Sequence, residues 1–489
     1  MKVSFVVPIY NKSEYQLGDC LKSLTKQSHK DNEIICVFDG KQGDLEAFVA
    51  KNYPNAKLVT IEHGGACKAR NEGFKHITGD VVSFWDADCY AEPEMSAVWV
   101  KGFTIHPEVD FIYSGYKWTD PTVPGFKSEP FDPWILGKYN YIASMFPIRK
   151  EKFPGWDESL TGLQDWDYWR RAVESGCKGY FVMGFGFSTD MPKEGDISTA
   201  KRDAVINRIK AVRMKHNDVK REIYINSMTY KQEAIKIAKY LDADYFNYPE
   251  FYKIDDYKTI IQCGFVPKEL EQINATFSKE DGVKNRIIYW MGVDAQQVAL
   301  SRHINVINWM KAIKESIHHN ICDCYETKKL LGEMGIDAKI IQLPRNEGQN
   351  YTILPEKFKV LAFTDEKYGE LMVSLRKALP DIDIDLVVPG NSYDIKNYSC
   401  AIQFSVSESI MDGTMNMLLS GRRVISNVKQ PYCGYVDIDD ITNAKNKIID
   451  KLYEFEKLKE IDTKASEHYL KETSPEVFKK RIEELTNGK

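Results

Sequence analysis

The stretch from Gly79 to Asp88 reads GDVVSFWDAD, and it decides the fold of the first part of the chain. Its apolar run at 81–85 is short and continuous, which is typical of a strand buried on both faces of a parallel sheet. The run ends at two acids, Asp86 and Asp88. Side chains two positions apart on an extended backbone lie on the same side of it. The two carboxylates are therefore expected together at the end of a buried strand.

Further apolar runs alternate with helical patterns around this stretch. Strands are predicted at 3–8, 33–38 and 57–61, and helices at 18–27, 45–52 and 66–77. This alternation predicts βαβ units, and hence an α/β fold built on a mainly parallel sheet. Ligands bind such sheets outside the carboxyl ends of the strands. Polar residues fall at those ends: Tyr10-Asn11, Asp39-Gly40 and the two acids after residue 85.

The sequence beyond residue 221 follows a second α/β pattern. Strands are predicted there at 222–226, 259–263, 286–290, 339–343, 360–363, 384–388, 400–404 and 424–426. Residues 199–221 are strongly basic and helical, and we interpret them as a connecting helix, because charged runs are usually solvated faces. The predicted organisation is a first domain at 1–198, a basic helical linker at 199–221, and a Rossmann-like region at 222–489 that divides into two subdomains near 344–355.

Composition and charge narrow the class of protein. The chain has 489 residues and a net charge of −5, so we expect no broadly basic surface for nucleic acid. The N-terminal residues lack the long apolar run and small-residue cleavage site of a signal peptide, and no segment approaches the ~20 apolar residues of a transmembrane helix. The ten cysteines are scattered. We therefore expect reduced thiols and a cytoplasmic protein.

Five stretches of the first 190 residues, taken in order, resemble the motifs of the family-two glycosyltransferases, a large inverting group with the GT-A fold. They are VVPIYN at 6–11, CVFDG at 36–40, GACKARNEG at 65–73, GDVVSFWDAD at 79–88 and GLQDWDYWR at 162–170. The resemblance implies a nucleotide-sugar-binding GT-A domain that transfers a sugar with inversion. Gln164 departs from the family, which usually has a glutamate before the aspartate at this point.

The resemblance also implies roles for single residues. Those expected to bind the donor are Pro8, Tyr10, Asp39, Arg70 and Asp86. Asp88, with Asp86, is expected to hold Mn²⁺ or Mg²⁺, because oxygen ligands suit these cations and a cation neutralises the diphosphate leaving group. Arg70 can pair with the diphosphate through its fixed charge and fork geometry, or remain a solvated helix arginine.

Asp39 is expected to accept the imide N–H of uracil, which favours a UDP-sugar donor. The alternative for Asp39 is an acid that starts a turn before Gly40. Asp165 is the candidate general base, because inversion needs one carboxylate to take the proton of the acceptor hydroxyl. Asp167 is interpreted as a structural acid at a helix start. Of the aromatic residues in this stretch, some are expected in the core at helical spacing, and one, Trp166, could offer a stacking face to the acceptor sugar.

The second half of the chain carries a further resemblance. Residues 404–421 read FSVSESIMDGTMNMLLSG and resemble the donor motif of GT-B glycosyltransferases, which has two glutamates with seven residues between them. Glu408 matches the first of them and marks a second candidate site, whereas Asn416 stands in place of the second. The region is then a degenerate transferase that binds acceptor, an assembly domain, or a second active transferase.

The favoured hypothesis is an enzyme that moves a sugar from a UDP-sugar to a hydroxyl of a glycan, a lipid-linked acceptor or a protein. One alternative is a phage-type enzyme that glycosylates modified DNA bases, for which the basic run at 201–220 is the one favourable feature. The other is a non-catalytic sugar- or nucleotide-binding module. Intact Asp39, Asp88 and Asp165 favour the enzyme, because decay of function usually removes metal and base positions early.

Overall fold

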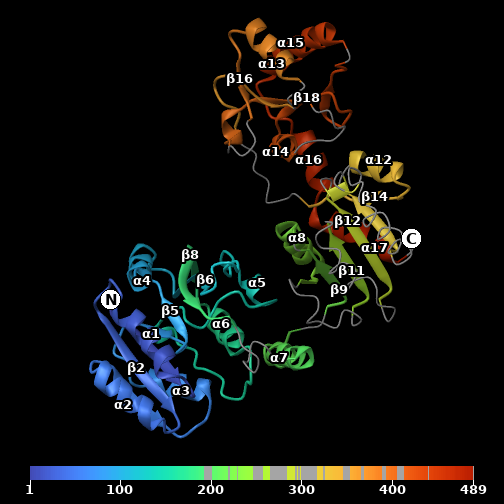
Figure 1. Ribbon diagram of the computed structural model, residues 1–489. Coiled ribbons are helices and arrows are strands. Elements are labelled where there is room, and N and C mark those ends of the chain that lie inside the picture. The colour runs from blue at the N-terminus through green and yellow to red at the C-terminus, as the bar shows by residue number, and fades with distance from the viewer. Residues whose placement is uncertain are drawn as a thin grey trace. The chain divides into compact units, whose positions relative to one another are not determined.

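The computed structural model describes most of the first 218 residues and about two thirds of the rest of the chain (Figure 1). The described residues are 1–191, 201–218, 221–227, 229–245, 257–264, 283–291, 294–295, 298, 317–322, 325–344, 353–364, 368–387, 393–404, 412–438 and 440–487. The chain divides into two compact units, and the boundary falls between Lys220 and Arg221.

The N-terminal unit is built on one eight-stranded sheet with the order β3-β2-β1-β4-β7-β6-β8-β5. Its parallel half consists of β1 (Val3–Ile9), β2 (Asn32–Asp39), β3 (Lys57–Ile61) and β4 (Val81–Phe84). Strands β1 and β4 are buried along almost their whole length, as a strand covered on both faces should be. The predicted parallel order of these four strands is confirmed.

Three helices follow the parallel strands in turn: α1 (Glu14–Thr25), α2 (Gly43–Asn52) and α3 (Ala66–Phe74). Helix α1 starts four residues before the predicted start at 18, because Ser13 and Gln16 form a capping box. Helix α3 packs against β1 and β2 through Gly73. A Cβ at Gly73 would lie 2.3 Å from Val6 Cγ1, so only glycine allows this close approach.

The other half of the sheet is mixed and was not predicted. It consists of β5 (Cys89–Ala91), β6 (Phe111–Trp118), β7 (Ile148–Arg149) and β8 (Gly179–Thr189), in which β7 runs antiparallel to β4 and β6, and β5 antiparallel to β8. The helices here are α4 (Met95–Ile105), α5 (Pro133–Leu136), the 3₁₀ turn η1 (Lys150–Lys152) and α6 (Gln164–Glu174).

Helix α7 (Arg202–Lys215) belongs to the N-terminal unit. The sequence suggested a solvated linker at 199–221, but Ile206, Ile209 and Val212 of this helix are buried. They recur at three-residue spacing and so form one apolar face. The basic residues lie on the rest of the helix, which is why the segment looks uniformly polar in composition.

The second unit holds two parallel sheets, as expected of an α/β region (Figure 1). The first sheet contains β9 (Ile223–Asn226), β10 (Asp244–Tyr245), β11 (Thr259–Cys263), β12 (Asn285–Trp290), β13 (His319–Cys322) and β14 (Lys339–Ile340). The second contains β15 (Lys359–Thr364), β16 (Asp383–Leu386), β17 (Cys400–Phe404), β18 (Arg423–Ser426) and β19 (Cys433–Tyr435).

Helices of the second unit connect and cover these sheets. They are α8 (Lys231–Leu241), α12 (Tyr325–Glu333), α13 (Gly369–Ala378), the 3₁₀ turn η7 (Ile395–Asn397), α14 (Asp412–Leu419), α15 (Ile441–Leu458), α16 (Thr463–Glu472) and α17 (Pro475–Thr486). Helix α17 returns to the first sheet, where Phe478 stacks on Tyr289 of β12. Glu408 lies outside the described residues, so the GT-B-like site stays a prediction.

Candidate active site

The candidate site lies at the carboxyl ends of β1, β2 and β4. These strands are parallel neighbours, so the residues that follow them share one edge of the sheet. Tyr10 follows β1, Asp39 ends β2, and Asp86 and Asp88 follow β4 after Trp85. The side chains of Asp86 and Asp88 are each 35% exposed, which leaves both carboxylates accessible from solvent.

Arg70 holds Asp86 and is itself held by an aromatic ring. Its guanidinium donates to Asp86 Oδ1 at 2.7 Å and lies 4.4 Å from the centre of the Trp156 ring. Arg70 is buried, so the solvated helix arginine that the sequence left open does not occur. A buried guanidinium beside a partly exposed carboxylate brings a fixed positive charge to the strand ends.

Asn71 holds Trp156 in the position where its ring contacts Arg70. Its side-chain amide accepts from Trp156 N at 2.8 Å and donates to Trp156 O at 2.9 Å. It thus binds both backbone groups of Trp156, as a neighbouring strand would. Trp156 stacks on Tyr168 of α6 with ring centres 4.2 Å apart. The arginine and asparagine of the GACKARNEG stretch therefore connect α3 to α6 through one tryptophan.

Asp88 pairs with Lys12, a residue that the sequence reasoning did not single out. Lys12 Nζ lies 2.5 Å from Asp88 Oδ2, on the loop that follows β1. Each acid of the D-x-D pair thus has one cationic partner from another element. The signal for Lys12 in the sequence was its place directly after Tyr10-Asn11, beside the predicted donor site.

Asp39 has a structural role, although with a distant loop and not with the turn before Gly40 that the sequence left as an alternative. It is 2% exposed, and its two carboxylate oxygens accept from the backbone amides of Gly64 at 2.7 Å and Gly65 at 2.9 Å. His63 Nδ1 lies 3.0 Å from the same carboxylate and stacks on the exposed ring of Tyr10. Asp39 therefore fixes the loop that leads into α3, and its contact with a nucleobase stays a prediction.

Asp165 lies at the start of α6, half-buried, with one donor on each carboxylate oxygen. Trp166 N donates to Oδ1 at 2.9 Å and Asn140 Nδ2 donates to Oδ2 at 2.8 Å. Burial raises the pKa of Asp165, and the negative charge of Asp86 adds to this rise. The Trp166 amide and the Arg70 charge act in the opposite direction, and the net pKa remains above its ordinary value. Asp165 and the strand-end acids thus share one electrostatic environment.

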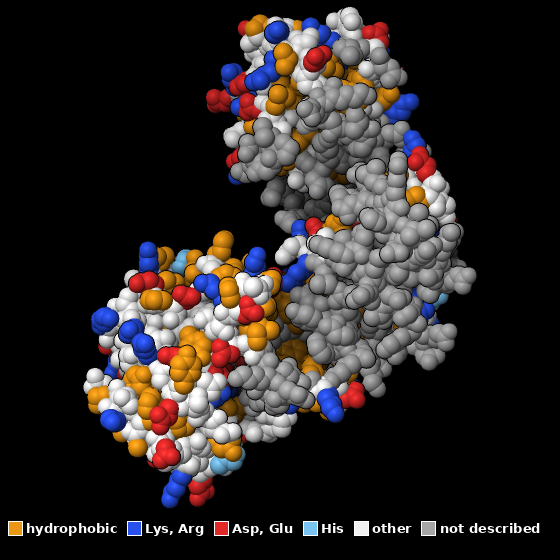
Figure 2. All heavy atoms as spheres, viewed as in Figure 1, with side chains coloured by type: hydrophobic (Ala, Val, Ile, Leu, Met, Phe, Trp, Pro, Cys, Tyr) orange, Lys and Arg blue, Asp and Glu red, His pale blue; other side chains and the backbone are white. Residues whose placement is uncertain are grey.

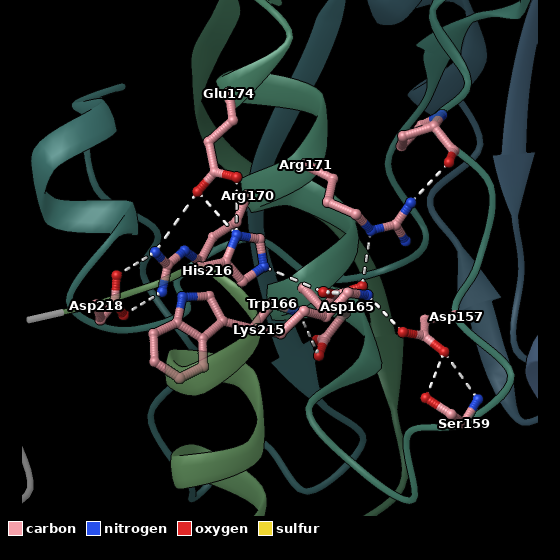
Figure 3. A network of polar contacts seen from close by, with 12 residues as sticks. Asp157, Ser159, Asp165, Trp166, Arg170, Arg171, Glu174, Lys215, His216 and Asp218 are labelled. Atoms are coloured by element: carbon pink, nitrogen blue, oxygen red, sulfur yellow. Dashed lines mark hydrogen bonds and ion pairs between the residues drawn. The ribbon is translucent and has the colours of Figure 1, made fainter.

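Asp167, two residues on, has different surroundings, and Figure 3 labels the three residues that contact it: Arg171, Lys215 and His216. Its side chain is fully buried and contacts Arg171 Nε at 2.8 Å, Lys215 Nζ at 2.7 Å and His216 Nε2 at 3.0 Å. Burial raises the pKa of Asp167, but the hydrogen bonds from these three residues outweigh burial and hold the pKa well below its usual range. The sequence predicted a structural acid here, although not its partners in α7.

The same network joins α6 to the end of α7 at further points. His216 Nδ1 contacts Glu174 at 2.8 Å, and the guanidinium of Arg170 donates twice to Asp218 at 2.6 Å. A hydrogen bond from Lys215 lowers the pKa of Asp157 to about 2. Part of the basic run at 201–220 is therefore paired within the unit instead of forming a free cationic stripe.

The prediction that Trp166 stacks on an acceptor sugar is wrong. Trp166 is 1% exposed, and its indole Nε1 donates to Leu136 O at 2.6 Å. Helical spacing identified a residue of α6 near Asp165 but could not tell the inner face from the outer one. The ring belongs to the core beneath the loop that follows α5.

The surface of the N-terminal unit carries charges of both signs. Figure 2 shows Lys and Arg side chains interspersed with Asp and Glu on the face in view. Within the described part of the chain, no helix combines the length and apolar character needed to cross a membrane.

Comparisons with known proteins agree with this geometry. Residues 4–158 match the family model described as Glycosyl transferase family 2, a range that contains Asp39, Arg70, Asp86 and Asp88 and ends just before Asp165. The O-antigen biosynthesis protein RfbC of Myxococcus xanthus is 26% identical over 218 residues, which is 41% of this chain and 16% of that protein.

Poly(ribitol-phosphate) beta-glucosyltransferase of Bacillus spizizenii is 36% identical over 107 residues, which is 20% of this chain and 17% of that enzyme. The chain thus spans less than a fifth of the length of either relative. The solved structure of S. aureus TarS 1-349 in complex with UDP-GlcNAc is 18% identical, with a TM-score of 0.37, and the match covers 65% of this chain and 82% of that one. By the family-model match alone, residues 4–158 of the N-terminal unit form a glycosyl transferase family 2 domain.

Proposed function

We propose that the N-terminal unit transfers a sugar from a UDP-sugar to a hydroxyl acceptor with inversion, and that Asp165 is the general base. The observation that carries this proposal is the shared environment of Asp165, Arg70 and Asp86, in which Arg70 binds Asp86 and its charge also acts on Asp165. A donor diphosphate beside Arg70 would then lie close to the carboxylate that accepts the proton. The family domain and the transferase names of its relatives support the same reaction class.

The environment of Asp165 suits a base. A carboxylate with a raised pKa is a stronger proton acceptor than an ordinary aspartate. Each carboxylate oxygen has one donor and can accept a further hydrogen bond, so an acceptor hydroxyl can approach either oxygen. No second carboxylate is needed as an acid, because the diphosphate is a stable leaving group once its charge is neutralised.

Asp88 and Asp86 fit a divalent cation. Mg²⁺ and Mn²⁺ prefer oxygen ligands, and Mg²⁺ is usually bound by one or two carboxylates together with substrate phosphates. The described residues contain no group of three His, Cys, Asp or Glu side chains that could hold a metal, so the donor phosphates would have to complete the coordination. When bound there, the cation would stabilise the charge that develops on the leaving diphosphate.

Replacement of Asp88 by alanine is expected to abolish the Mn²⁺-dependent part of UDP binding. The loss should reach about 100-fold or more in affinity, because even groups that only support a metal ligand contribute about 10–100-fold. Isothermal titration with UDP, with and without Mn²⁺, measures it. Asp44→Ala, an exposed acid of α2, is the matched control. Unchanged UDP affinity in the presence of Mn²⁺ would remove Asp88 from the metal site.

Replacement of Asp39 by alanine is expected to weaken UDP more than pyrophosphate. A contact with the uracil imide is lost only for the ligand that has a base, and such a hydrogen bond to a charged group contributes about 1.5–3 kcal/mol. Competition binding with both ligands gives the ratio. Because Asp39 also holds the loop before α3, which carries Arg70, an equal loss for both ligands would mean that the loop is its only role.

The acceptor is proposed to be a hydroxyl of a glycan, a lipid-linked molecule or a protein, and the second unit is proposed to bind it or to assemble the protein. Glycosylation of modified DNA bases gains no support from α7, since Lys215 and Arg213 of that helix pair with Asp157, Asp167 and Asp218. Hydrolysis of a panel of UDP-sugars in the presence of Mn²⁺ tests the proposed function directly. No turnover with any donor would favour a non-catalytic binding module.

A further inference from the structure

We propose that Asn140 is a positioning residue that aims the Asp165 carboxylate at the acceptor hydroxyl, an inference that rests on the proposed function. Asn140 lies in the loop after α5, and its Nδ2 donates to Asp165 Oδ2 at 2.8 Å. Its own Oδ1 accepts from Ile142 N at 3.2 Å. This second bond determines which side of the amide faces the acid, because the opposite orientation would place two donors against each other.

The loop that carries Asn140 is anchored on both sides of this residue. Trp166 and Trp169 of α6 donate their indole N–H groups to Leu136 O at 2.6 Å and to Ala143 O at 3.2 Å. Both tryptophans are fully buried, so these bonds are sheltered from water. Asp165 belongs to the same helix. The loop and the carboxylate are therefore held to one rigid element, and their relative position is set before any substrate arrives.

A third anchor comes from the sheet side of the loop. The hydroxyl oxygen of Ser128, itself buried, lies 2.8 Å from Tyr141 O and 2.8 Å from Ser114 O of β6, so its one proton serves the two carbonyl oxygens. The backbone directly after Asn140 is thereby tied to the central sheet. Three side chains thus position the loop from which the Asn140 amide contacts the candidate base.

The two hydrogen-bond donors, Trp166 N and Asn140 Nδ2, bind different oxygens of the Asp165 carboxylate. Trp166 N uses one lone pair of Oδ1 and Asn140 uses one of Oδ2, so the plane of the carboxylate is fixed by a donor at each end. A hydrogen bond to the ionised form also favours that form and lowers the pKa. Among the charged groups that act on Asp165, Arg70 of α3 has the same effect and Asp86 after β4 has the opposite one.

Loss of the Asn140 amide should therefore change both the rate and its pH dependence. In Asn140→Ala we expect kcat for hydrolysis of UDP-glucose or UDP-N-acetylglucosamine with Mn²⁺ to fall about tenfold or more, as a lost hydrogen bond to a charged group implies. The acid limb of kcat should move to higher pH, because the carboxylate loses a donor that favoured its ionised form. KM for the donor should change little, since Asn140 faces the base and not the diphosphate.

The variant Asn140→Asp distinguishes a positioning role of Asn140 from a general disturbance of the loop. It keeps the size and the acceptor for Ile142 N, but it places a second carboxylate against Asp165, which raises the pKa of a neighbouring acid. Its acid limb should move further than that of Asn140→Ala. Lys138→Ala is the matched control, since this lysine lies in the same loop and contacts the Trp134 ring, 5.1 Å from the ring centre, and we expect wild-type values for it.

Calorimetric binding of UDP by each variant verifies the folded unit. If both Asn140 variants bind UDP and keep kcat and the acid limb within about twofold of wild type, while Asp165→Asn is inactive, the positioning role is wrong and the proposed function stands. A fall in kcat without movement of the acid limb in either variant assigns Asn140 a structural role and also overturns the inference. If Asp165→Asn hydrolyses donor as fast as wild type, the proposed function fails, and the inference fails with it.

Discussion

Asp165→Asn is expected to lower kcat by about 10²–10⁴-fold, the contribution of a general base in the transition state. Asparagine keeps the size of the side chain but cannot take a proton, and its single carbonyl oxygen replaces only one of the two oxygens that accept from Trp166 N and Asn140 Nδ2. Affinity for UDP should be preserved, because the variant leaves Arg70 and the strand-end acids in place. Steady-state hydrolysis of a UDP-sugar, together with UDP titration calorimetry, measures both quantities.

Asp167→Asn is the internal control for this result. Asp167 lies two residues further along α6 and faces α7, so its loss should leave turnover of the folded protein near that of wild type. If Asp167→Asn removed turnover and Asp165→Asn did not, the base would lie at Asp167. If neither changed turnover, the N-terminal site would not be catalytic.

Asp167→Ala is expected to lower the free energy of unfolding by about 3 kcal/mol at pH 7. An acid at a solvent-exposed helix start contributes only about 0.3–1 kcal/mol. Removal of one partner from a buried ion pair costs about 3–5 kcal/mol. The lower end applies here, because Lys215 and Arg171 are 31% and 24% exposed and can regain water. Urea-induced unfolding followed by tryptophan fluorescence gives the difference.

The pH dependence provides a second test of the same residue. The pKa of Asp167 is lower in the folded chain than in the unfolded one, so its stabilisation is fully present above the unfolded value of about 4 and is lost as pH falls through the folded value. The difference between wild type and Asp167→Ala should therefore shrink below about pH 4. Glu108→Ala, an exposed acid, should change stability by no more than about 0.5 kcal/mol at any pH. A constant difference between wild type and Asp167→Ala from neutral to acid pH would contradict the ion-pair explanation.

The part of the site that the sequence predicts is the part built from consecutive strands. Apolar runs locate β1, β2 and β4, and parallel neighbours bring Tyr10, Asp39 and Asp86 to one edge. Local patterns suffice there because the strands are buried on both faces and the acids follow them directly. The same reasoning does not predict the mixed half of the sheet, since β7 has only two residues and Phe187 is the one buried position of β8.

The residues that complete the site come from contacts that no local pattern records. Asn140 is a single loop amide 25 positions before Asp165, and Lys12 meets Asp88 across 76 positions. Asp167 finds Lys215 and His216 in a segment whose composition suggested a linker. In each case the partner is chosen by tertiary packing, and the sequence reveals only that a polar residue is present.

The attachment of α7 to α6 determines where a chimera of this protein can be joined. A graft that ends at residue 198, the predicted end of the first domain, would leave Asp167 and Arg170 without Lys215, His216 and Asp218. A junction after residue 218 keeps all three partners. In any recombinant fusion or exchange of the second unit, residues 201–218 should therefore stay joined to the transferase domain.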